Sequence, residues 1–399
     1  MRYGRAAIPA LAGGLLLTAL LFWAGASVNA LRLQGTAEAL GGRMAADLEN
    51  WLIPWSYDPP DSVRFGTGAL GGIGDPASAD PGRHLSLYGT GMQIRFAAVF
   101  AFFVPGALLL VRRLPPVNGR TPVTLLAVWA WGLVAGALAV TVSAPWIIAS
   151  QGNGSYRLLP HLASVSSGGR QIVVVTALVA AAVTVLVARI TAKGAGPLPL
   201  RDVPGRAARI AATAGTAVVA LSSVALSYHP VAATVQTVSL PGLPEPGDLL
   251  RQWLLLGGWA GPADGQTGHW FLYRVADALL LAVVWCALRW LPVLLTRATV
   301  PAMVAGTVSA TVVGLLANQV LQMAVTGADS GMRWGWQHLS GSLGNGVPAA
   351  LTWGVLAGLI TVVTLRLAGG GAAGTETVPP PPTTPTEPAP TRLPDRPAV

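Results

Sequence analysis

Residues 122–146 read PVTLLAVWAWGLVAGALAVTVSAPW, an apolar run without a charged side chain. A helix needs about 20 such residues to cross the roughly 30 Å hydrocarbon core of a bilayer. Seven further stretches have a comparable length and character: 7–30, 96–112, 171–191, 208–228, 276–296, 300–325 and 348–367. The sequence therefore predicts an all-α, polytopic transmembrane helix bundle of about eight spans, with the lipid bilayer as its main partner.

The composition of the whole chain agrees with this interpretation. Hydrophobic residues make up 52% of the 399 positions and charged residues only 10%, with a mean hydropathy of +0.57. A soluble domain carries about 25% charged residues, so this chain needs lipid to cover much of its surface. The net charge of +9 is segregated by side rather than gathered in one patch, and we therefore expect no nucleic-acid partner.

Orientation follows from the rule that short cytoplasmic loops are rich in Lys and Arg. With the N-terminus placed inside, the cytoplasmic face receives Arg2, Arg5, Arg112, Arg113, Arg120, Arg189, Lys193, Arg201, Arg206, Arg209, Arg289, Arg297, Arg366, Arg392 and Arg396. The other face has slightly more acids than arginines. The preference for Arg over Lys, with abundant Ala and Gly, is typical of high-GC bacteria. We predict a multi-pass protein of a bacterial cell (plasma) membrane with both termini in the cytoplasm.

The first span leaves one alternative open, because Val28-Asn29-Ala30 is a passable signal-peptidase site. The apolar stretch before it is longer than the usual signal-peptide core of about 7–15 residues, which favours a retained span.

An internal repeat relates the two halves of the chain. His161-Leu162 pairs with His338-Leu339, and at the same spacing Gly169 pairs with Gly346, Ala180 with Ala357, Thr184-Val185 with Thr361-Val362 and Arg189 with Arg366. Nearby, Gly136, Leu138 and Ala139 pair with Gly314, Leu316 and Ala317. The outer loops match as His84-x-x-x-Tyr88 with His269-x-x-x-Tyr273, as Asn50-Trp51-Leu52 with Gln252-Trp253-Leu254, and as Leu70-Gly71-Gly72 with Leu256-Gly257-Gly258. We predict a four-plus-four parallel duplication; biased composition and similar loop lengths are the alternative explanation.

This division predicts three regions. They are a first four-span half, 1–200, with a long outer loop at 31–94; a second four-span half, 201–368, with an outer loop at 229–275; and a Pro-rich tail, 369–399. The tail lacks the apolar residues of a core, so we expect it to be disordered and cytoplasmic.

Asp47 and Glu49 are candidate catalytic residues in the first outer loop. An acidic pair after a first span is found in polytopic lipid-linked glycosyltransferases, where it can bind a divalent cation and activate an acceptor. The simpler interpretation is the polar face of an amphipathic helix, since Leu33, Leu40, Met44 and Trp51 recur at helical spacing. We favour that interpretation and expect no catalytic residue.

The most polar group within a span is Asn318-Gln319 with Gln322. Neutral amides in a membrane either line a substrate path or hold helices together by hydrogen bonds. Helix contact is the more common role, and both roles stay open at this point.

Histidines fall in the predicted outer loops, and His84, His161, His269 and His338, with Tyr88 and Tyr273, belong to the repeat. No His or Cys spacing typical of a metal site accompanies them, so we interpret them as repeat-inherited loop residues. The one cysteine, Cys286, lies in an apolar run. No phosphate loop, zinc-protease motif or serine-hydrolase motif is present, and we predict no metal and no cofactor.

The chain resembles actinobacterial multi-spanning membrane proteins of the streptophobe group. The features that carry the resemblance are the Arg-over-Lys bias, the Ala/Val/Gly-rich spans, the long Gly/Pro-rich outer loops and the Pro-rich tail. No activity is assigned to that group, so the resemblance implies a membrane location and nothing about chemistry.

Three classes of function remain. The protein is a non-enzymatic envelope or accessory component that binds membrane-protein partners, or a permease or channel for a neutral or amphiphilic small molecule, or a membrane enzyme that uses the outer-loop acids. The absence of a coupling motif favours the first. The buried amides and the repeat favour the second. The oligomeric state is left open.

Overall fold

A computed structural model gives the arrangement of the chain. It describes residues 3–31, 33–60, 63, 81–116, 119–151, 158–192, 204–238, 245–262, 267–296, 299–326 and 332–369. Within these ranges the chain is helical, apart from loops and an isolated bridge between Tyr228 and Trp259. The proline-rich tail after residue 369 and the Leu70-Gly71-Gly72 segment lie outside the described residues.

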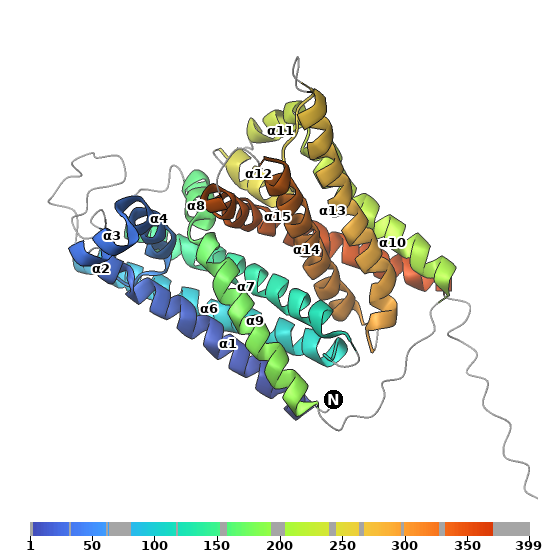
Figure 1. Cartoon of the computed structure of the whole chain (residues 1–399), viewed down its shortest axis with the longest axis horizontal. Helices are drawn as coiled ribbons and strands as arrows, with labels where there is room; N and C mark the ends of the chain where they lie inside the picture. Colours follow the sequence, from blue (N-terminus) through green and yellow to red (C-terminus); the bar gives the residue numbers. More distant parts are fainter. Residues whose placement is uncertain are drawn as a thin grey trace, which may run out of the picture.

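Eight helices are long and apolar enough to cross a membrane, as the sequence predicts. They belong to α1 (Tyr3–Ala26), α6 (Pro81–Arg113), α7 (Thr121–Ser150), α9 (Arg170–Thr191), α10 (Gly205–Ala220), α13 (Thr267–Leu294), α14 (Val300–Thr326) and α15 (Met332–Gly369). The last turns of α10 widen into a π-helix, Leu221–Leu226. The fold is therefore an all-α bundle of membrane-spanning helices (Figure 1).

Shorter helices gather at one end of the bundle, which we call the long-loop end (Figure 1). They are α2 (Val28–Leu31), α3 (Gln34–Leu40), α4 (Gly42–Leu52), the 3₁₀ turn Ile53–Trp55, α8 (Leu158–Ser167), α11 (His229–Gln236) and α12 (Gly247–Leu254). The single amphipathic helix that the sequence predicts over 33–51 is wrong: Gly41, with φ +83°, divides it into α3 and α4. Leu33 and Met44 of the predicted apolar stripe are exposed.

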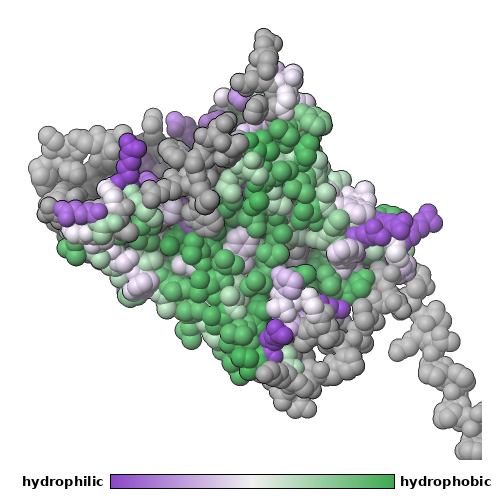
Figure 2. All heavy atoms as spheres, viewed as in Figure 1, coloured by the Kyte–Doolittle hydropathy of each residue, from purple (hydrophilic) through white to green (hydrophobic). Residues whose placement is uncertain are grey.

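The opposite end, which we call the basic end, carries arginines at helix termini. Arg112 and Arg113 end α6, Arg120 precedes α7, Arg189 lies in the last turn of α9, Arg206 begins α10 and Arg366 lies near the end of α15. Between the two ends, large apolar side chains such as Leu15, Leu186 and Trp290 are exposed. Figure 2 shows the same distribution, with apolar side chains across the middle and hydrophilic ones towards the ends. This surface suits a bilayer.

The spans form two groups of four that pack in the same order. In the first half α1 contacts α6 and α9, and α7 contacts both of these neighbours. In the second half α10 contacts α13 and α15, and α14 contacts both of these in turn. The two groups meet mainly through α7 and α14, the third span of each, with α15 also against α7 and α9. Ser309 of α14 donates to the carbonyl of Ala127 across this contact, at 3.1 Å.

Small residues let the helices of each half approach closely. A Cβ on Gly13 of α1 would lie 1.9 Å from the hydroxyl of Thr184 on α9, and a Cβ on Gly215 of α10 would lie 2.3 Å from the hydroxyl of Thr361 on α15. Both threonine hydroxyls are buried and donate to a carbonyl one turn earlier, at 2.7 Å. Close packing through small residues is the main way in which helices associate in a membrane.

Candidate functional site

The amides of α14 connect three spans at the long-loop end. Asn318 is only 5% exposed and donates its Nδ2 hydrogen to the Asp277 carboxylate of α13 at 2.9 Å. Gln322 donates to Asn318 Oδ1 at 2.6 Å. Gln319 accepts a hydrogen bond from Ser342 of α15 at 2.8 Å. Asn318 and Gln319 thus bond α14 to α13 and α15, and the bond of Gln322 to Asn318 lies within α14; the choice between helix contact and a substrate path stays a prediction.

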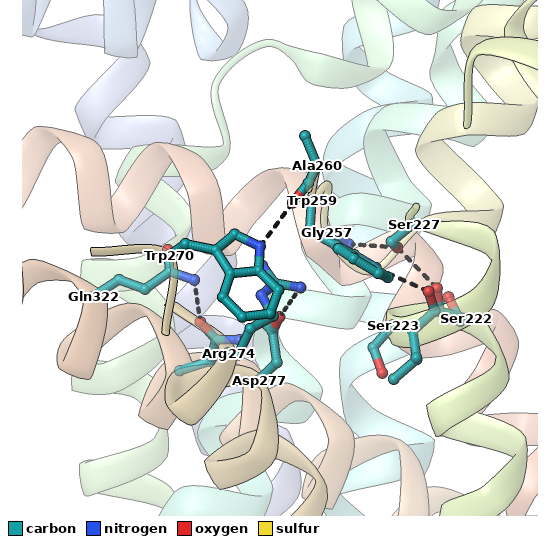
Figure 3. Close-up of polar contacts among 12 residues, drawn as sticks. Ser222, Ser223, Ser227, Gly257, Trp259, Ala260, Trp270, Arg274, Asp277 and Gln322 are labelled. Atoms are coloured by element: carbon teal, nitrogen blue, oxygen red, sulfur yellow. Dashed lines mark hydrogen bonds and ion pairs between the residues drawn. The ribbon is translucent and has the colours of Figure 1, made fainter. Parts of the chain in front are cut away.

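An ion pair adjoins these amides. Arg274 and Asp277, one turn apart on α13, lie 2.7 Å from each other with side chains that are 24% and 22% exposed. The Arg274 guanidinium also lies over the ring of Trp259, 4.9 Å from its centroid (Figure 3). Asp277 is thus satisfied by one cation and one amide, which is the condition for keeping a carboxylate at a half-buried position.

Two serines fix the chain segment that crosses above α10, residues 255–261. Ser222, in the π-helix, donates to the carbonyl of Leu254 at 2.6 Å. Ser227 donates to the Ser222 carbonyl at 2.8 Å and accepts from the backbone N–H of Gly257 at 3.2 Å. Figure 3 shows both serines turned towards this segment. A π-helix leaves backbone groups out of the α-helical ladder and is often found at functional sites; here it serves to anchor the segment.

The segment, α13 and α14 surround a cavity of about 390 Å³ that we call lobe B. Its lining includes Trp259, Trp270, Tyr273, Arg274, Asp277 and Gln322. The indole N–H of Trp270 donates to the carbonyl of Ala260 at 2.8 Å, so this ring is held at the mouth of the lobe (Figure 3).

A second cavity of about 560 Å³, lobe A, lies where α8 of the first half faces α12 and α15 of the second. Ser164, Ser167, Asp248, Arg251, Ser342 and Asn345 line it. Leu256, Gly257 and Gln319 line both lobes. We call lobes A and B together the two-lobed cavity; Leu256, Gly257 and Gln319 form the wall that they share.

Towards the basic end, α14 carries buried apolar side chains together with buried Thr307, Ser309 and Thr311, whose hydroxyls donate to backbone carbonyls. On α14, Val308 and Val312 are fully buried and Leu315 is 2% exposed. Val347 and Ala350 of α15 are buried beside them. The α14 residues that line the two lobes are Asn318, Gln319 and Gln322, which lie beyond this stretch at the long-loop end.

At the long-loop end of the first half, buried side chains occupy the space between the helices. Trp55 is fully buried; its indole N–H donates to the carbonyl of Gly169 at 2.8 Å. The buried Arg95 of α6 donates to Ser143 at 2.9 Å and to the carbonyl of Pro54, and it lies 5.7 Å from the Trp55 ring centroid. We call Pro54, Trp55 and Ser56 the Trp55 plug.

Aromatic rings extend this plug towards the membrane surface. Tyr57 stacks on Phe96 at 5.4 Å, and partial burial raises the pKa of the Tyr57 hydroxyl. Tyr88 donates to the carbonyl of Ser56 at 2.8 Å. Residues 54–57 are thus held by side chains of α6.

The repeat histidines and tyrosines lie in helices α6, α8, α13 and α15, and the described side chains among them have separate contacts. His84 Nδ1 lies 3.0 Å from the carbonyl of Ser150, and Tyr88 belongs to the plug. Tyr273 lines lobe B, and His161 lies on α8. The side chains of His269 and His338 lie outside the described residues. Within the described part of the chain, no three His, Cys, Asp or Glu side chains form a group suited to a metal ion.

Asp47 and Glu49 lie on α4 in the first half, which contacts α2, the Ile53–Trp55 turn and α9. They line neither lobe of the cavity. The structure thus does not bring them together with the amides of α14, and their predicted catalytic role stays untested.

A second buried arginine joins the two halves. Arg170, at the start of α9, is 5% exposed and donates to the carbonyls of Ser166 and Gly344, at 2.6 and 3.0 Å. Because Gly344 belongs to α15, this side chain ties α9 to the second half beside lobe A. Charged groups buried in a membrane protein usually pair with backbone carbonyls in this way.

Sequence reasoning missed Arg274, Asp277 and Trp259 as parts of the site. One signal was available, because Asp277 is the acidic residue at the start of the predicted 276–296 span and follows Arg274 by one helical turn. The role of Trp259 depends on how the 255–261 segment folds back onto the helices, and no local sequence pattern predicts that fold.

Comparison with family models, with curated proteins and with solved structures finds no match to this chain. The resemblance to streptophobe proteins accordingly stays a prediction.

Proposed function

We propose that this integral membrane protein is a non-enzymatic envelope component that binds a ligand from the outer side of the membrane through its two-lobed cavity. The observation that carries the proposal is the one-sided shape of the site. Polar and apolar side chains line both lobes, and the α14 residues among them all lie at the long-loop end, whereas Val308, Val312 and Leu315 nearer the basic end are buried and line neither lobe. Such a site can hold a molecule without passing it through the membrane.

The distribution of charge supports placing the cavity outside the cell. The arginines that terminate α6, α9 and α15 lie at the end opposite to the cavity. Short basic loops stay in the cytoplasm, so the long-loop end of a protein in a bacterial plasma membrane faces outwards, with both termini inside.

The four-plus-four duplication is part of the proposal. Its best support is the pair of close contacts Gly13–Thr184 and Gly215–Thr361, because Thr184 and Thr361 are the residues that the sequence repeat equates. Both halves also pack their four spans in the same order. A parallel repeat of this kind is known in some transporters.

A permease for a neutral or amphiphilic molecule is the second candidate. The observation in its favour is that lobe A lies between α8 of the first half and α12 and α15 of the second. A rocking motion of the halves would change that lobe, which is the usual basis of alternating access. Catalysis by Asp47 and Glu49 is the third candidate and has no support from their position on α4.

Cysteine accessibility distinguishes these functions. In a Cys286→Ser background, Gln319→Cys places a thiol between the lobes. We expect a membrane-impermeant maleimide to label it in right-side-out vesicles and not in inside-out vesicles. Thr234→Cys on exposed α11 and Arg209→Cys at the basic end are the controls for the two sides.

Labelling of Gln319→Cys from both sides would favour the permease. Labelling only from the side of Arg209→Cys would overturn the proposed orientation. Protection from labelling by a bound molecule would support the cavity as a ligand site directly.

A further inference from the structure

We propose that the two-lobed cavity recognises a neutral, polyhydroxylated group, that is, a sugar, either free or as the headgroup of a glycolipid. This inference rests on the proposed function, since it names the class of ligand that the same cavity binds. Its support comes from the charge balance, the hydrogen-bonding groups and the aromatic lining of the two lobes.

The charges of the lining are balanced within each lobe. Lobe A has Asp248 and Arg251, and lobe B has Asp277 and Arg274, which are already paired at 2.7 Å. An anionic ligand would have to displace Asp277 from Arg274, and a cationic ligand would have to displace Arg274 from Asp277. Since unpaired charge at a half-buried site is costly, lobe B favours a ligand without net charge; Asp248 and Arg251 of lobe A are exposed, and their opposite charges leave that lobe without a net charge.

The remaining polar groups suit hydroxyls. Gln252, Gln319, Gln322 and Asn345 carry amides, and Ser164 and Ser342 carry hydroxyls. Amide and hydroxyl side chains each offer both donors and acceptors. A sugar hydroxyl also donates and accepts, so each of its two roles can be met by a neighbouring side chain without a change of protonation.

The aromatic residues of lobe B supply an apolar surface beside these polar groups. Trp259 is covered by Tyr228, with ring centroids 4.6 Å apart, and by the Arg274 guanidinium. Its own N–H is satisfied by the carbonyl of Val224 at 2.8 Å. Trp270 is fixed through its N–H to Ala260 and lines the same lobe. The negative face of an indole ring attracts positively polarised C–H groups, which the apolar face of a sugar ring presents. Because Tyr228 and Arg274 cover Trp259, Trp270 is the indole that a sugar ring would contact in lobe B.

The size of the cavity and its place near the membrane surface agree with such a ligand. Lobes of about 560 and 390 Å³ fall in the range of small-molecule sites, which is roughly 300–1,000 Å³. Because both lobes share Gln319, a ligand in either lobe can bond to this side chain.

The test uses the full-length protein in phospholipid nanodiscs. The probes are maltose as a free sugar, monoglucosyl diacylglycerol as a neutral glycolipid, diacylglycerol without a headgroup and phosphatidylglycerol as an anionic lipid. Maltose binding is measured by calorimetry and lipid retention by native mass spectrometry. We expect maltose or the glycolipid to bind and diacylglycerol not to be retained.

Gly257→Trp is the variant that fills the cavity. A Cβ at residue 257 meets no atom within 4 Å, so the side chain has room to enter the shared wall of the lobes. We expect the ring to displace ligand contacts and to raise the Kd by about tenfold or more, which corresponds to a loss of about 1.4 kcal/mol of binding free energy. Gly35→Trp on exposed α3 also meets open space, lies in the first half and is the matched control. Gln319→Leu, which keeps the size of the side chain, provides the same test if Gly257→Trp does not fold.

The outcomes separate the two levels of the proposal. Binding of a neutral sugar probe that the cavity variants weaken and Gly35→Trp does not supports the inference, and comparison of maltose with the glycolipid identifies the source. Retention of phosphatidylglycerol in place of the sugars, sensitive to the same variants, overturns the sugar class but keeps the outer ligand site. If no probe binds, the sugar inference is wrong, and outside-only labelling of Gln319→Cys then decides whether the site itself survives.

Discussion

The first and second halves of the bundle differ in how their long-loop ends are packed. In the first half the Trp55 plug is buried and held by Arg95, whereas in the second half the 255–261 segment borders a cavity. The helices beneath pack in the same order in both halves. The difference therefore arises from a few side chains rather than from the arrangement of the spans.

The sequence repeat identifies these side chains. Counted from the match of Asn50-Trp51-Leu52 with Gln252-Trp253-Leu254, Trp55 corresponds to Gly257, whereas the match of Leu70-Gly71-Gly72 with Leu256-Gly257-Gly258 pairs Gly257 with Gly71. Met92 and Asp277 each lie four residues after a repeat tyrosine. Val140 follows Ala139 as Asn318 follows Ala317. On the first of these counts, the predicted repeat places Trp55, Met92 and Val140, all buried, at the positions of Gly257, Asp277 and Asn318. A bulky apolar side chain fills the space between helices, whereas glycine leaves that space empty and polar side chains allow water to enter it.

Two close contacts support this pairing. A Cβ on Gly25 of α1 would lie 1.9 Å from the carbonyl oxygen of Trp55, so α1 and the plug touch through their backbones. Ser227, after the second half's first span, accepts a hydrogen bond from the N–H of Gly257. The same two stretches of chain meet in each half, once through glycine at the plug and once through serine at the cavity.

The largest expected effect is the removal of the plug by Trp55→Ala. The variant loses a fully buried ring, its hydrogen bond to Gly169 and its contact with Arg95. Replacement of a buried Trp by Ala costs about 3–5 kcal/mol. Denaturant unfolding of the purified protein in detergent micelles measures the loss. Trp23→Ala, at a side chain that is 71% exposed on α1, is the matched control and should change little. Equal effects of the two variants would show that the plug does not stabilise the first half.

The next effect tests the close contact between a glycine and a threonine that is found in both halves. Gly13→Ala and Gly215→Ala each push a methyl group against a buried threonine hydroxyl, on Thr184 and Thr361 respectively. Overpacking of this kind costs about 1–3 kcal/mol, which exceeds the gain in helix propensity of about 1 kcal/mol. We expect both variants to lower the unfolding midpoint by similar amounts.

Gly35→Ala on α3, where a Cβ meets nothing within 4 Å, controls for the helix propensity and should be neutral or slightly stabilising. A large loss for one of Gly13 and Gly215 and none for the other would contradict the shared packing on which the proposed duplication rests.

The number and approximate bounds of the spans could be predicted from sequence because hydrocarbon thickness fixes the length of an apolar run. The polar amides could be found for a related reason: Asn318, Gln319 and Gln322 stand out in a span where polar groups are costly. In contrast, the depth of Trp55 was not predictable. An outer-loop tryptophan is usually an interface anchor, and only the fold of 53–58 shows that this ring is buried against Gly169 and Arg95. Lobe A depends on contacts between α8 and α12, which are distant in sequence.

A smaller effect separates the two roles of the α14 amides. Asn318→Leu leaves Asp277 and Gln322 without one hydrogen bond each, at a cost of about 1 kcal/mol, since side-chain hydrogen bonds between membrane helices average roughly 0.6 and reach about 1.7 kcal/mol. Gln319→Leu removes the bond to Ser342 and the side chain shared by the lobes. We expect Asn318→Leu to lower stability more, and Gln319→Leu to reduce ligand binding more. Unfolding midpoints and probe binding, measured on both variants, check this. Losses of binding that simply follow the losses of stability would mean that the amides only hold helices together.

The smallest expected change in stability belongs to Gly257→Trp, which gives the second half the residue that plugs the first. Trp55 is stabilising because Gly169 accepts its hydrogen bond and Arg95 covers its ring. At residue 257 the backbone is already bonded to Ser227, and a Cβ meets open space, so the new ring neither clashes nor gains such partners. The free energy of unfolding should therefore change by no more than about 0.5 kcal/mol. It is measured beside that of Trp55→Ala under the same conditions. A large loss would mean that the lobes are too tight for an indole, and the two halves would then differ in packing as well as in filling. A large gain would mean that the second half retains the contacts of a plug and lacks only its ring, so that a glycine at this position keeps the cavity open at the expense of stability.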